Sequence, residues 1–126
     1  MEIRNDRMYA QSHEWVKFES GGTALVGVSD FAQNELGDLV FVNLPQEGDS
    51  VEKGGMLADV ESVKAVSDIY SPVGGTVAAV NEELLDEPEK VNAAPYEAWL
   101  CCLTDISPDR EGLMTADEYQ AFLDKQ

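Results

Sequence analysis

The sequence predicts a single, mainly β domain with two helices, and three observations lead to this fold class. Segments rich in β-branched and aromatic residues recur along the 126 residues and are separated by glycine and proline. Two of these segments follow a Gly-Gly pair, at 54–55 and at 74–75. Helix-capping signals precede two other stretches, at Ser29 and at Thr115. A chain of this length can enclose one modest hydrophobic core.

The first predicted strand pair lies near the N-terminus. Residues 9–18 combine aromatic and β-branched residues, as is typical of a strand. The glycine pair at 21–22 marks a turn, and residues 23–28 form the expected returning strand. The two segments therefore predict a strand–turn–strand unit.

A short helix and a third strand are expected next. Ser29 is a favourable N-cap, and Gly37 stands where a helix that begins there would end. The helix is therefore predicted over residues 30–36. Residues 38–44 are mostly apolar and predict a strand that stops at Pro45.

A weak internal repeat relates residues 53–60 to residues 73–80. Each copy contains a Gly-Gly bend that leads into an apolar strand, and repeated units of this kind indicate two similar halves packed face to face. A chance likeness between two ordinary glycine turns explains the alignment equally well. Lys64 falls in the segment that links the two copies.

The segment around Lys64 is predicted to be a hairpin with an unusual tip. Apolar residues recur every three positions from Val60 to Ile69, which fits neither a helix nor a strand, but β-branched residues dominate and favour strands. The expected tip, residues 63–65, lacks the Gly, Pro, Asn and Asp that usually build turns. Apolar residues at an exposed reversal break a local rule, and such exceptions mark functional sites. We therefore expect another protein to recognise this tip and modify the lysine.

The C-terminal part is expected to contain a loop, a strand and a helix. Residues 81–95 are acidic and predict a loop, and residues 97–103 predict a strand. Thr115 and Glu118 form the capping-box pattern of a final helix. Its expected apolar face consists of Leu113, Tyr119, Phe122 and Leu123.

The two cysteines, Cys101 and Cys102, are adjacent in the sequence. Neighbouring strand residues point to opposite faces of a sheet, so the two thiols are not expected to pair with each other. Two cysteines supply neither a disulfide framework nor a four-cysteine zinc site. One buried thiol and one outward-facing thiol are expected instead.

The charge balance excludes two classes of partner. Asp and Glu total 25 against 8 Lys and Arg, a formal net charge of −17. Such a surface repels nucleic-acid phosphates and anionic membranes, and it attracts partners with basic patches. A gain in solubility accounts for the acidity equally well. The first residues resemble neither a signal nor a transit peptide, so a cytoplasmic protein is expected, with a processed mitochondrial matrix protein as the less favoured alternative.

Several motifs together resemble one known family, the H proteins of the glycine cleavage system, over nearly the entire chain. The most specific of them is Glu-Ser-Val-Lys-Ala-Val-Ser-Asp at 61–68. Biotin carriers of similar fold usually flank their lysine with methionines, which are absent here. The other matching motifs lie at 12–16, 29–33, 36–38, 40–42, 71–72, 91–92, 95–96 and 99–100.

The resemblance implies a specific fold. It is a barrel-sandwich hybrid of two small antiparallel sheets, with the lysine at a hairpin tip, a helix near 30–36 and a C-terminal helix near 115–124. The chain would form one lipoyl-carrier domain over 1–126. Its lipoyl-like core would span about 23–104, and the C-terminal helical segment 113–126.

The resemblance also implies a function, that of a non-catalytic, monomeric carrier. Lipoate in amide linkage to Lys64 would take the aminomethyl group of glycine from the pyridoxal-phosphate-dependent glycine decarboxylase (P protein). It would deliver this group to the tetrahydrofolate-dependent aminomethyltransferase (T protein), and dihydrolipoamide dehydrogenase (L protein) would reoxidise it. A lipoate ligase or an octanoyl or lipoyl transferase would attach the group.

Other residues receive roles by the same resemblance. Ser12, Glu14 and Asp68 would shelter the loaded arm, whose cationic amine suits a carboxylate. No chemistry is assigned to His13. Without the resemblance, Lys64 would be interpreted as a surface lysine paired with Glu61 or Asp68. The residues expected to present the lysine for recognition are Glu61, Ser62, Val63 and Ala65, together with Asp68.

Two alternatives to the glycine cleavage carrier remain. Some H-like proteins relay octanoyl or lipoyl groups in cofactor assembly or serve in sulfur metabolism, and these also need Lys64. An unmodified module whose acidic surface binds a basic protein is a different class. An enzyme has little support, because the sequence offers no nucleophile–base pair, metal cluster or phosphate loop.

Overall fold

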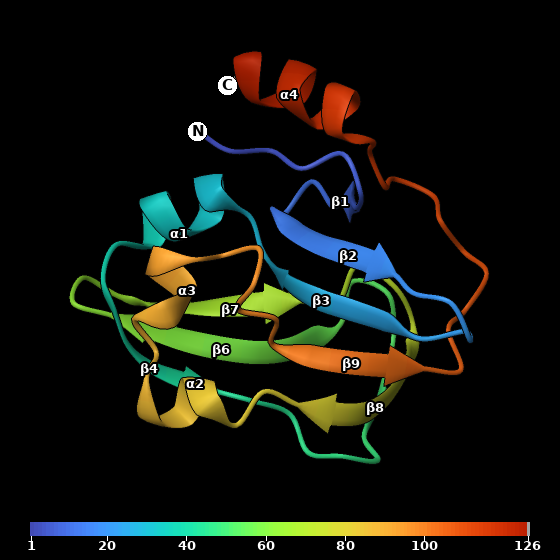
Figure 1. Ribbon diagram of the computed structural model, residues 1–126, viewed down its shortest axis with the longest axis horizontal. Coiled ribbons are helices and arrows are strands. Elements are labelled where there is room, and N and C mark those ends of the chain that lie inside the picture. Colours follow the sequence, from blue (N-terminus) through green and yellow to red (C-terminus); the bar gives the residue numbers. More distant parts are fainter. Residues whose placement is uncertain (126) are drawn as a thin grey trace.

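The strands of the protein form two antiparallel sheets in a computed structural model that describes residues 1–125 (Figure 1). The six-stranded sheet has the order β1-β2-β3-β9-β8-β5, and the three-stranded sheet has the order β4-β6-β7. The predicted mainly β class is confirmed, and over residues 1–125 the two sheets stay separate and do not close into one barrel. The strands are β1 (Met8–Tyr9), β2 (Glu14–Phe18), β3 (Ala24–Val28), β4 (Leu39–Asn43), β5 (Ser50–Val51), β6 (Met56–Ser62), β7 (Val66–Tyr70), β8 (Gly75–Val80) and β9 (Cys101–Thr104).

The helices lie around the sheets. In the part of the chain that the structure describes, none is long and apolar enough to span a bilayer. Helix α1 follows β3 directly, and α4 packs on the N-terminal segment above β2 (Figure 1). The helices are α1 (Asp30–Leu36), α2 (Glu83–Asp86), α3 (Lys90–Ala93) and α4 (Ala116–Asp124).

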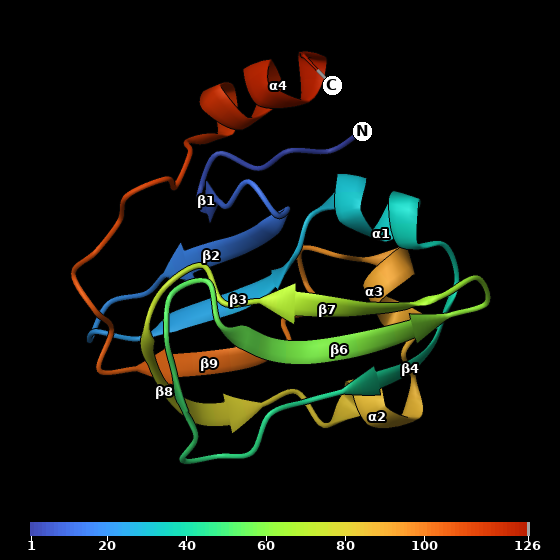
Figure 2. The ribbon, with the colours of Figure 1, turned by 180° about the vertical axis from the view of Figure 1, so that it is seen from behind.

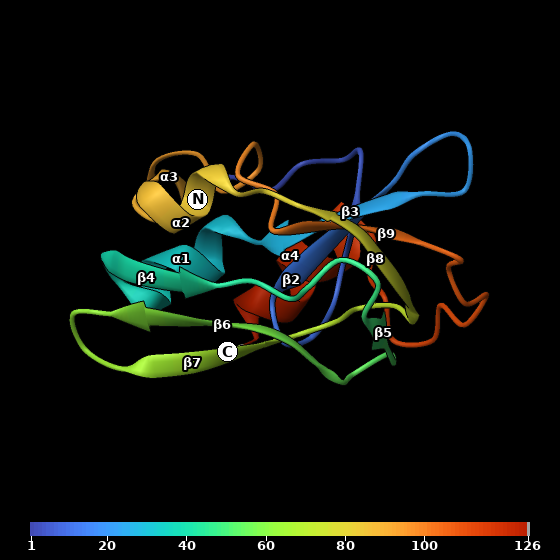
Figure 3. The same cartoon turned by 90° about the horizontal axis from the view of Figure 1, so that it is seen from below.

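The hydrophobic core lies between the two sheets, which Figure 3 shows one above the other. Strand β6 contributes to both main clusters, because a bulge between Met56 and Ala58 buries the consecutive residues Leu57 and Ala58. The aligned segments of the internal repeat supply β6 to one sheet and β8 to the other. The two copies therefore lie in opposite layers.

The expected strand over 9–18 is broken in the structure. Strand β1 ends at Tyr9, and β2 begins only at Glu14. Between them the His13 N–H donates to Ala10 O at 2.9 Å, and His13 has a φ of 78°, which strands do not adopt. Because of this break, Glu14 is the first residue of a separate strand.

A glycine inside β3 permits a large side chain on β2. Trp15 pairs directly with Gly27 across the two strands. A Cβ at position 27 would lie 2.4 Å from the indole Cζ2 of Trp15. The absence of a side chain at Gly27 is therefore what lets the Trp15 ring lie flat against β3 and be buried.

The prediction of a loop over 81–95 is wrong. Two four-residue helices, α2 and α3, form there. They lack side-chain caps, so burial of Leu84 and Val91 in the core holds them in place. The predicted strand over 97–103 is also shorter, because Ala98 N–H still donates to Ala94 O in a turn and β9 starts at Cys101.

The predictions for α1, the cysteines and α4 are confirmed. Ser29 caps α1 through its side chain, and Gly37 follows its end. Cys101 is buried and Cys102 is partly exposed. The capping box forms at the start of α4, with Tyr119 buried and Phe122 and Leu123 beside it. Leu113 precedes the helix and packs on a different cluster, and residue 126 of the predicted segment 113–126 lies outside the described residues.

Removing the cap of α4 should lower stability. Thr115 Oγ1 accepts from Glu118 N–H at 3.2 Å, and Glu118 Oε1 accepts from Thr115 N–H at 2.8 Å. We expect Thr115→Ala to reduce the free energy of unfolding in urea by about 1 kcal/mol. Thr115→Ser keeps the hydroxyl and should unfold like the wild type; equal stability of the alanine and serine variants would contradict the assigned cap.

Candidate functional site

Lys64 lies at the tip of the β6–β7 hairpin, which projects from one end of the molecule (Figures 2 and 3). The last strand pair is Glu61 with Val66, and Ser62 N–H donates to Ala65 O at 2.8 Å to close the turn. Lys64 is exposed, and the neighbouring Val63 is 71% exposed. The hairpin predicted from sequence is thus present, with the lysine amine accessible to solvent.

One side chain explains how this turn forms without the usual turn residues. The hydroxyl of Ser62 accepts from the backbone N–H groups of Lys64 and Ala65, each at 3.2 Å, and reaches Ala65 O at 3.2 Å. Serine can replace a backbone turn in this way. A further bond, from Val63 N–H to Asp38 O at 3.1 Å, ties the tip to the segment before β4. The structure therefore gives Ser62 a turn-forming role beside the recognition role predicted for it.

The side chain of Lys64 folds back toward the end of α1. Its Nζ donates to the Glu35 carbonyl at 3.2 Å. A Cβ at Gly37, which has a φ of 79°, would lie 3.0 Å from Lys64 Cε. Within residues 1–125 the Lys64 amine forms no ion pair, so the pairing with Glu61 or Asp68 that the sequence alone would favour is not found. One hydrogen bond to an exposed carbonyl leaves the amine free to react.

A cleft of about 330 Å³ opens between α1 and the edge strand β7, next to this lysine. It brings together Ser12, Glu14 and Asp68, the three residues predicted as a shelter. Glu35, whose carbonyl holds Lys64 Nζ, also lines the cleft. The lysine amine is thus held by a residue of the cleft lining, although Lys64 itself does not line the cleft. The rest of the lining is His13, Val28, Phe31, Ala32, Leu36, Ser67 and Ile69.

The apolar wall of the cleft was missed by sequence reasoning. Helix α1 supplies Phe31, Ala32 and Leu36, and none of its residues is fully buried. An amphipathic helix normally covers its apolar face against the core. Here part of that face lines an open groove. The helix was predicted correctly, but no pattern in the sequence indicates that part of its apolar face stays open to a cleft.

Glu14 is the most perturbed acid of the site. It is 2% exposed, accepts from Tyr70 N–H at 3.2 Å through Oε2, and accepts a short bond from the Ser12 hydroxyl through Oε1. Burial raises the pKa of Glu14 to about 7, against the lowering effect of these two donors. No cation of residues 1–125 pairs with it. A cation entering the cleft would therefore favour the ionised form of Glu14.

Asp68 and Ser12 occupy more exposed positions. In β7, Ile69 points into the core and Asp68 lies on the solvent side, at the rim of the cleft. Asp68 pairs across the strands with Asp59 of β6. Ser12 is exposed and acts on the cleft through its bond to Glu14. The predicted shelter thus consists of one buried carboxylate, the hydroxyl that holds it and one carboxylate at the rim.

His13 links the cleft to the C-terminal helix. Its Nδ1 lies 2.8 Å from the Tyr119 hydroxyl, which lies 2.7 Å from Ser29 Oγ. Ser29 Oγ in turn accepts from Ala32 N–H as the cap of α1. These contacts join three elements of the fold. They connect α4 to the helix that forms the cleft wall.

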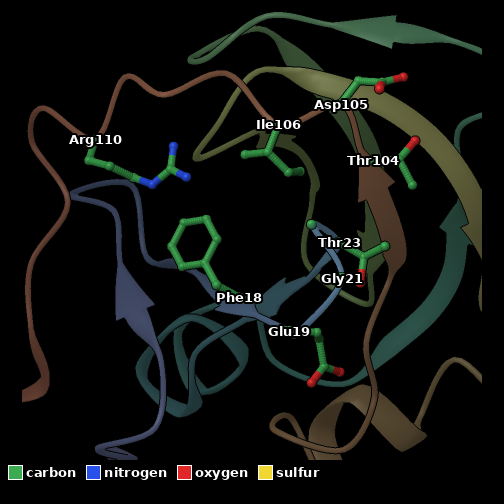
Figure 4. Close-up of a pocket in the computed structure, with 9 residues that line it drawn as sticks. Phe18, Glu19, Gly21, Thr23, Thr104, Asp105, Ile106 and Arg110 are labelled. Carbon is green, nitrogen blue, oxygen red and sulfur yellow. The ribbon is translucent and has the colours of Figure 1, made fainter.

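A larger cavity lies elsewhere. Its volume is about 580 Å³, and it opens at the ends of β2 and β9, at the opposite end of the molecule from Lys64 (Figures 1 and 4). The Arg110 guanidinium carbon lies 4.3 Å from the centre of the Phe18 ring at its wall. None of the predicted site residues lines this cavity. The residues that line it are Phe18, Glu19, Gly21, Gly22, Thr23, Thr104, Asp105, Ile106 and Arg110.

Comparison with known proteins finds the same family throughout. The sequence model of the family described as "Glycine cleavage H-protein" matches residues 7–126. The chain is 55% identical to the glycine cleavage system H protein of Lachnoclostridium phytofermentans, over 100% of this chain and 98% of that protein. It is 48% identical to that of Listeria innocua, over 98% and 100%. The crystal structure of a glycine cleavage system H protein from Mycobacterium marinum matches with a TM-score of 0.85 and 37% identity, over 94% and 97% of the two chains.

Proposed function

Since this chain belongs to the glycine cleavage H-protein family, and is thus a lipoyl carrier of the glycine cleavage system, we propose that Lys64 is its point of lipoate attachment. One observation carries the proposal: the exposed Lys64 donates its amine hydrogen bond to Glu35, which lines a cleft with an apolar wall and a buried carboxylate. A ligase can reach this amine, and an acyl chain on it can fold into the cleft.

The residues that line the cleft fit a lipoyl group. Phe31, Ala32 and Leu36 of α1 give the cleft an apolar wall for a hydrocarbon chain and a disulfide ring. Acylation removes the ammonium charge of Lys64, which favours contact with such a wall. When bound, lipoate supplies a dithiolane that accepts and releases the aminomethyl group of glycine. The protein's own contribution is to tether, orient and shelter.

Glu14 gives the cleft a preference for cations. We propose that a cationic amine in the cleft pairs with the Glu14 carboxylate while the Ser12 hydroxyl and the Tyr70 N–H hold that carboxylate in place. Asp68 at the rim adds a second negative charge. The apolar wall limits the access of water to a reactive amine. Such a site protects a bound group without supplying an acid or base for the main reaction.

As a subunit of the glycine cleavage system, the protein works with its P, T and L proteins. Tethering raises the concentration of the carried group at each partner without any catalysis by the carrier. We propose further that the protein is a monomer, that a lipoate ligase or an octanoyl or lipoyl transferase loads Lys64, and that Glu61, Val63 and Ala65 present it. A cytoplasmic site of action is proposed from the bacterial relatives.

The mass of the Lys64 peptide from the native host tests the proposal. We expect a lipoyl adduct on the peptide that contains Lys64 and unmodified masses for the peptides that contain Lys17, Lys53 and Lys90. An unmodified Lys64 in cells that contain lipoate and a ligase would contradict the assignment and favour an acidic binding module. A modified lysine without reconstituted glycine decarboxylation would favour the octanoyl or lipoyl relay instead.

A further inference from the structure

Figure 2 shows the three-stranded sheet and its hairpin tip, and the outer face of this sheet carries exposed apolar side chains next to the tip. We call this surface the docking face. Exposed apolar groups that gather at one place mark interaction sites more often than isolated ones do. Its members are Val40 (54% exposed), Phe41 (49%), Val63 (71%) and Val66 (64%).

A β-bulge creates this surface. Strand β4 reads Leu-Val-Phe-Val, and regular alternation would direct one of Val40 and Phe41 into the core. The register shifts between Leu39 and Phe41, so that the extra residue Val40 and the next residue Phe41 both face solvent. Phe41 then pairs with Glu61, which pairs with Val66. This row crosses all three strands directly beside the tip.

The docking face is surrounded by negative charge. Strands β4, β6 and β7 contain no Lys or Arg, and Asp59 and Asp68 lie opposite each other in the row next to Glu61. Like charges at directly paired positions destabilise a sheet. The Asn43 amide donates to Asp59 Oδ1 at 2.6 Å, which satisfies one of these carboxylates without neutralising it. A partner with a basic rim would neutralise this cluster.

The geometry also limits which partner fits. The cleft lies between α1 and β7, so a protein on the docking face meets it only at the rim, at Asp68. An enzyme that forms a bond at Lys64 Nζ must contact the hairpin tip itself, because its active site can be no farther away than the lysine stem is long. Partners that act at the far end of a loaded arm need no such close contact.

We propose that the docking face is the recognition surface for the enzyme that acylates Lys64, and that this enzyme offers an apolar groove with a basic rim beside its active site. The inference rests on the proposed attachment of lipoate to Lys64. In the transfer, Lys64 Nζ bonds to the acyl carbon of a thioester or an acyl adenylate. The bond from that carbon to sulfur or phosphate oxygen breaks, the leaving group takes the electron pair, and Nζ loses a proton.

The test is the rate of Lys64 acylation by a lipoate–protein ligase supplied with lipoate and ATP. We expect Phe41→Ser and Val66→Ser each to lower kcat/KM roughly tenfold, mainly through KM, since each removes a large apolar contact. Met56→Ser is the matched control, because Met56 is 59% exposed on the same sheet but pairs with Tyr70 at the far end of the hairpin. It should be acylated like the wild type.

The salt dependence of the acylation rate tests the charged part of the docking face independently of its apolar part. The wild-type rate should fall as salt rises, and Glu61→Gln should be slower at low salt and depend less on salt. Wild-type kcat/KM for Phe41→Ser and Val66→Ser, with thermal unfolding unchanged, would overturn the inference. A wild-type dimer that Phe41→Ser dissociates without change in acylation would also overturn it and identify a self-association surface. A wild type that the ligase cannot acylate at all would instead overturn the assignment of Lys64.

Discussion

Lys64→Arg should abolish glycine cleavage in a system reconstituted with P, T and L proteins, while the protein folds normally. Arginine keeps the positive charge and the length of the side chain, but its guanidinium stays protonated and does not form the amide that lysine forms. Among residues 1–125 the Lys64 amine makes one hydrogen bond, to Glu35 O, so little stability depends on it. We expect the free energy of unfolding to stay within about 0.5 kcal/mol of the wild type.

Release of carbon dioxide from labelled glycine measures this loss, and intact mass verifies that the arginine variant carries no lipoyl group. Lys125→Arg is the matched control, because Lys125 is also exposed and lies at the end of α4, far from the hairpin. It should retain full activity. Glycine cleavage by the Lys64→Arg variant would show that the arm is anchored elsewhere.

Glu14→Gln should stabilise the protein at pH 8 by about 3 kcal/mol and have little effect at pH 4. The folded-state pKa of Glu14 is about 7, above its ordinary value of 4.5, because burial disfavours the charged form. Below 4.5 the residue is protonated in both states, so it costs nothing. As pH rises from 4.5 to 7 the wild type loses stability, and above 7 the full difference of about 3 kcal/mol applies. Glutamine avoids this loss because it never ionises.

Urea unfolding of both proteins from pH 4 to pH 8 gives this difference at each pH. Glutamine can still accept from Tyr70 N–H and contact Ser12, the partners that Glu14 has, so the change isolates the charge. Glu47→Gln, at an exposed position, should show no such trend. A constant difference across the range would contradict a raised pKa for Glu14.

The same variant separates stability from function. Without a carboxylate the cleft loses its ion pair with a cationic amine, so we expect the carried aminomethyl group to be lost to water faster while the fold is more stable. Loss of ammonia or formaldehyde from the loaded carrier, measured without T protein, gives the rate. An unchanged rate would remove Glu14 from the shelter.

The parts of the fold that were predictable are those encoded by local signals. Ser29 and Gly37 bracket α1, and Thr115 starts α4, because caps act through neighbouring backbone groups. Helices α2 and α3 could not be predicted in this way. Burial of Leu84 and Val91 determines them, and burial depends on strands distant in the sequence.

Of the candidate site, too, only the part encoded by local signals could be predicted from the residues. The hairpin around Lys64 followed from β-branched residues, but the role of Ser62 in the turn did not, because its hydroxyl takes the place of the expected glycine or asparagine. Ser12, Glu14 and Asp68 came from resemblance alone. These residues converge because the chain breaks before β2 and because of the way β7 packs. Neither feature can be recognised from the residues of a single segment.

The hydroxyl of Ser62 has a mechanical consequence for the carrier. Because it binds the peptide N–H groups on both sides of Lys64, and Asp38 anchors the same turn through Val63, the pivot of the arm is tied to the sheets. The arm then moves by rotation about the bonds of the Lys64 side chain and of the group attached to it. The arm therefore moves about one point, and its maximum reach is the same for each enzyme that binds the carrier.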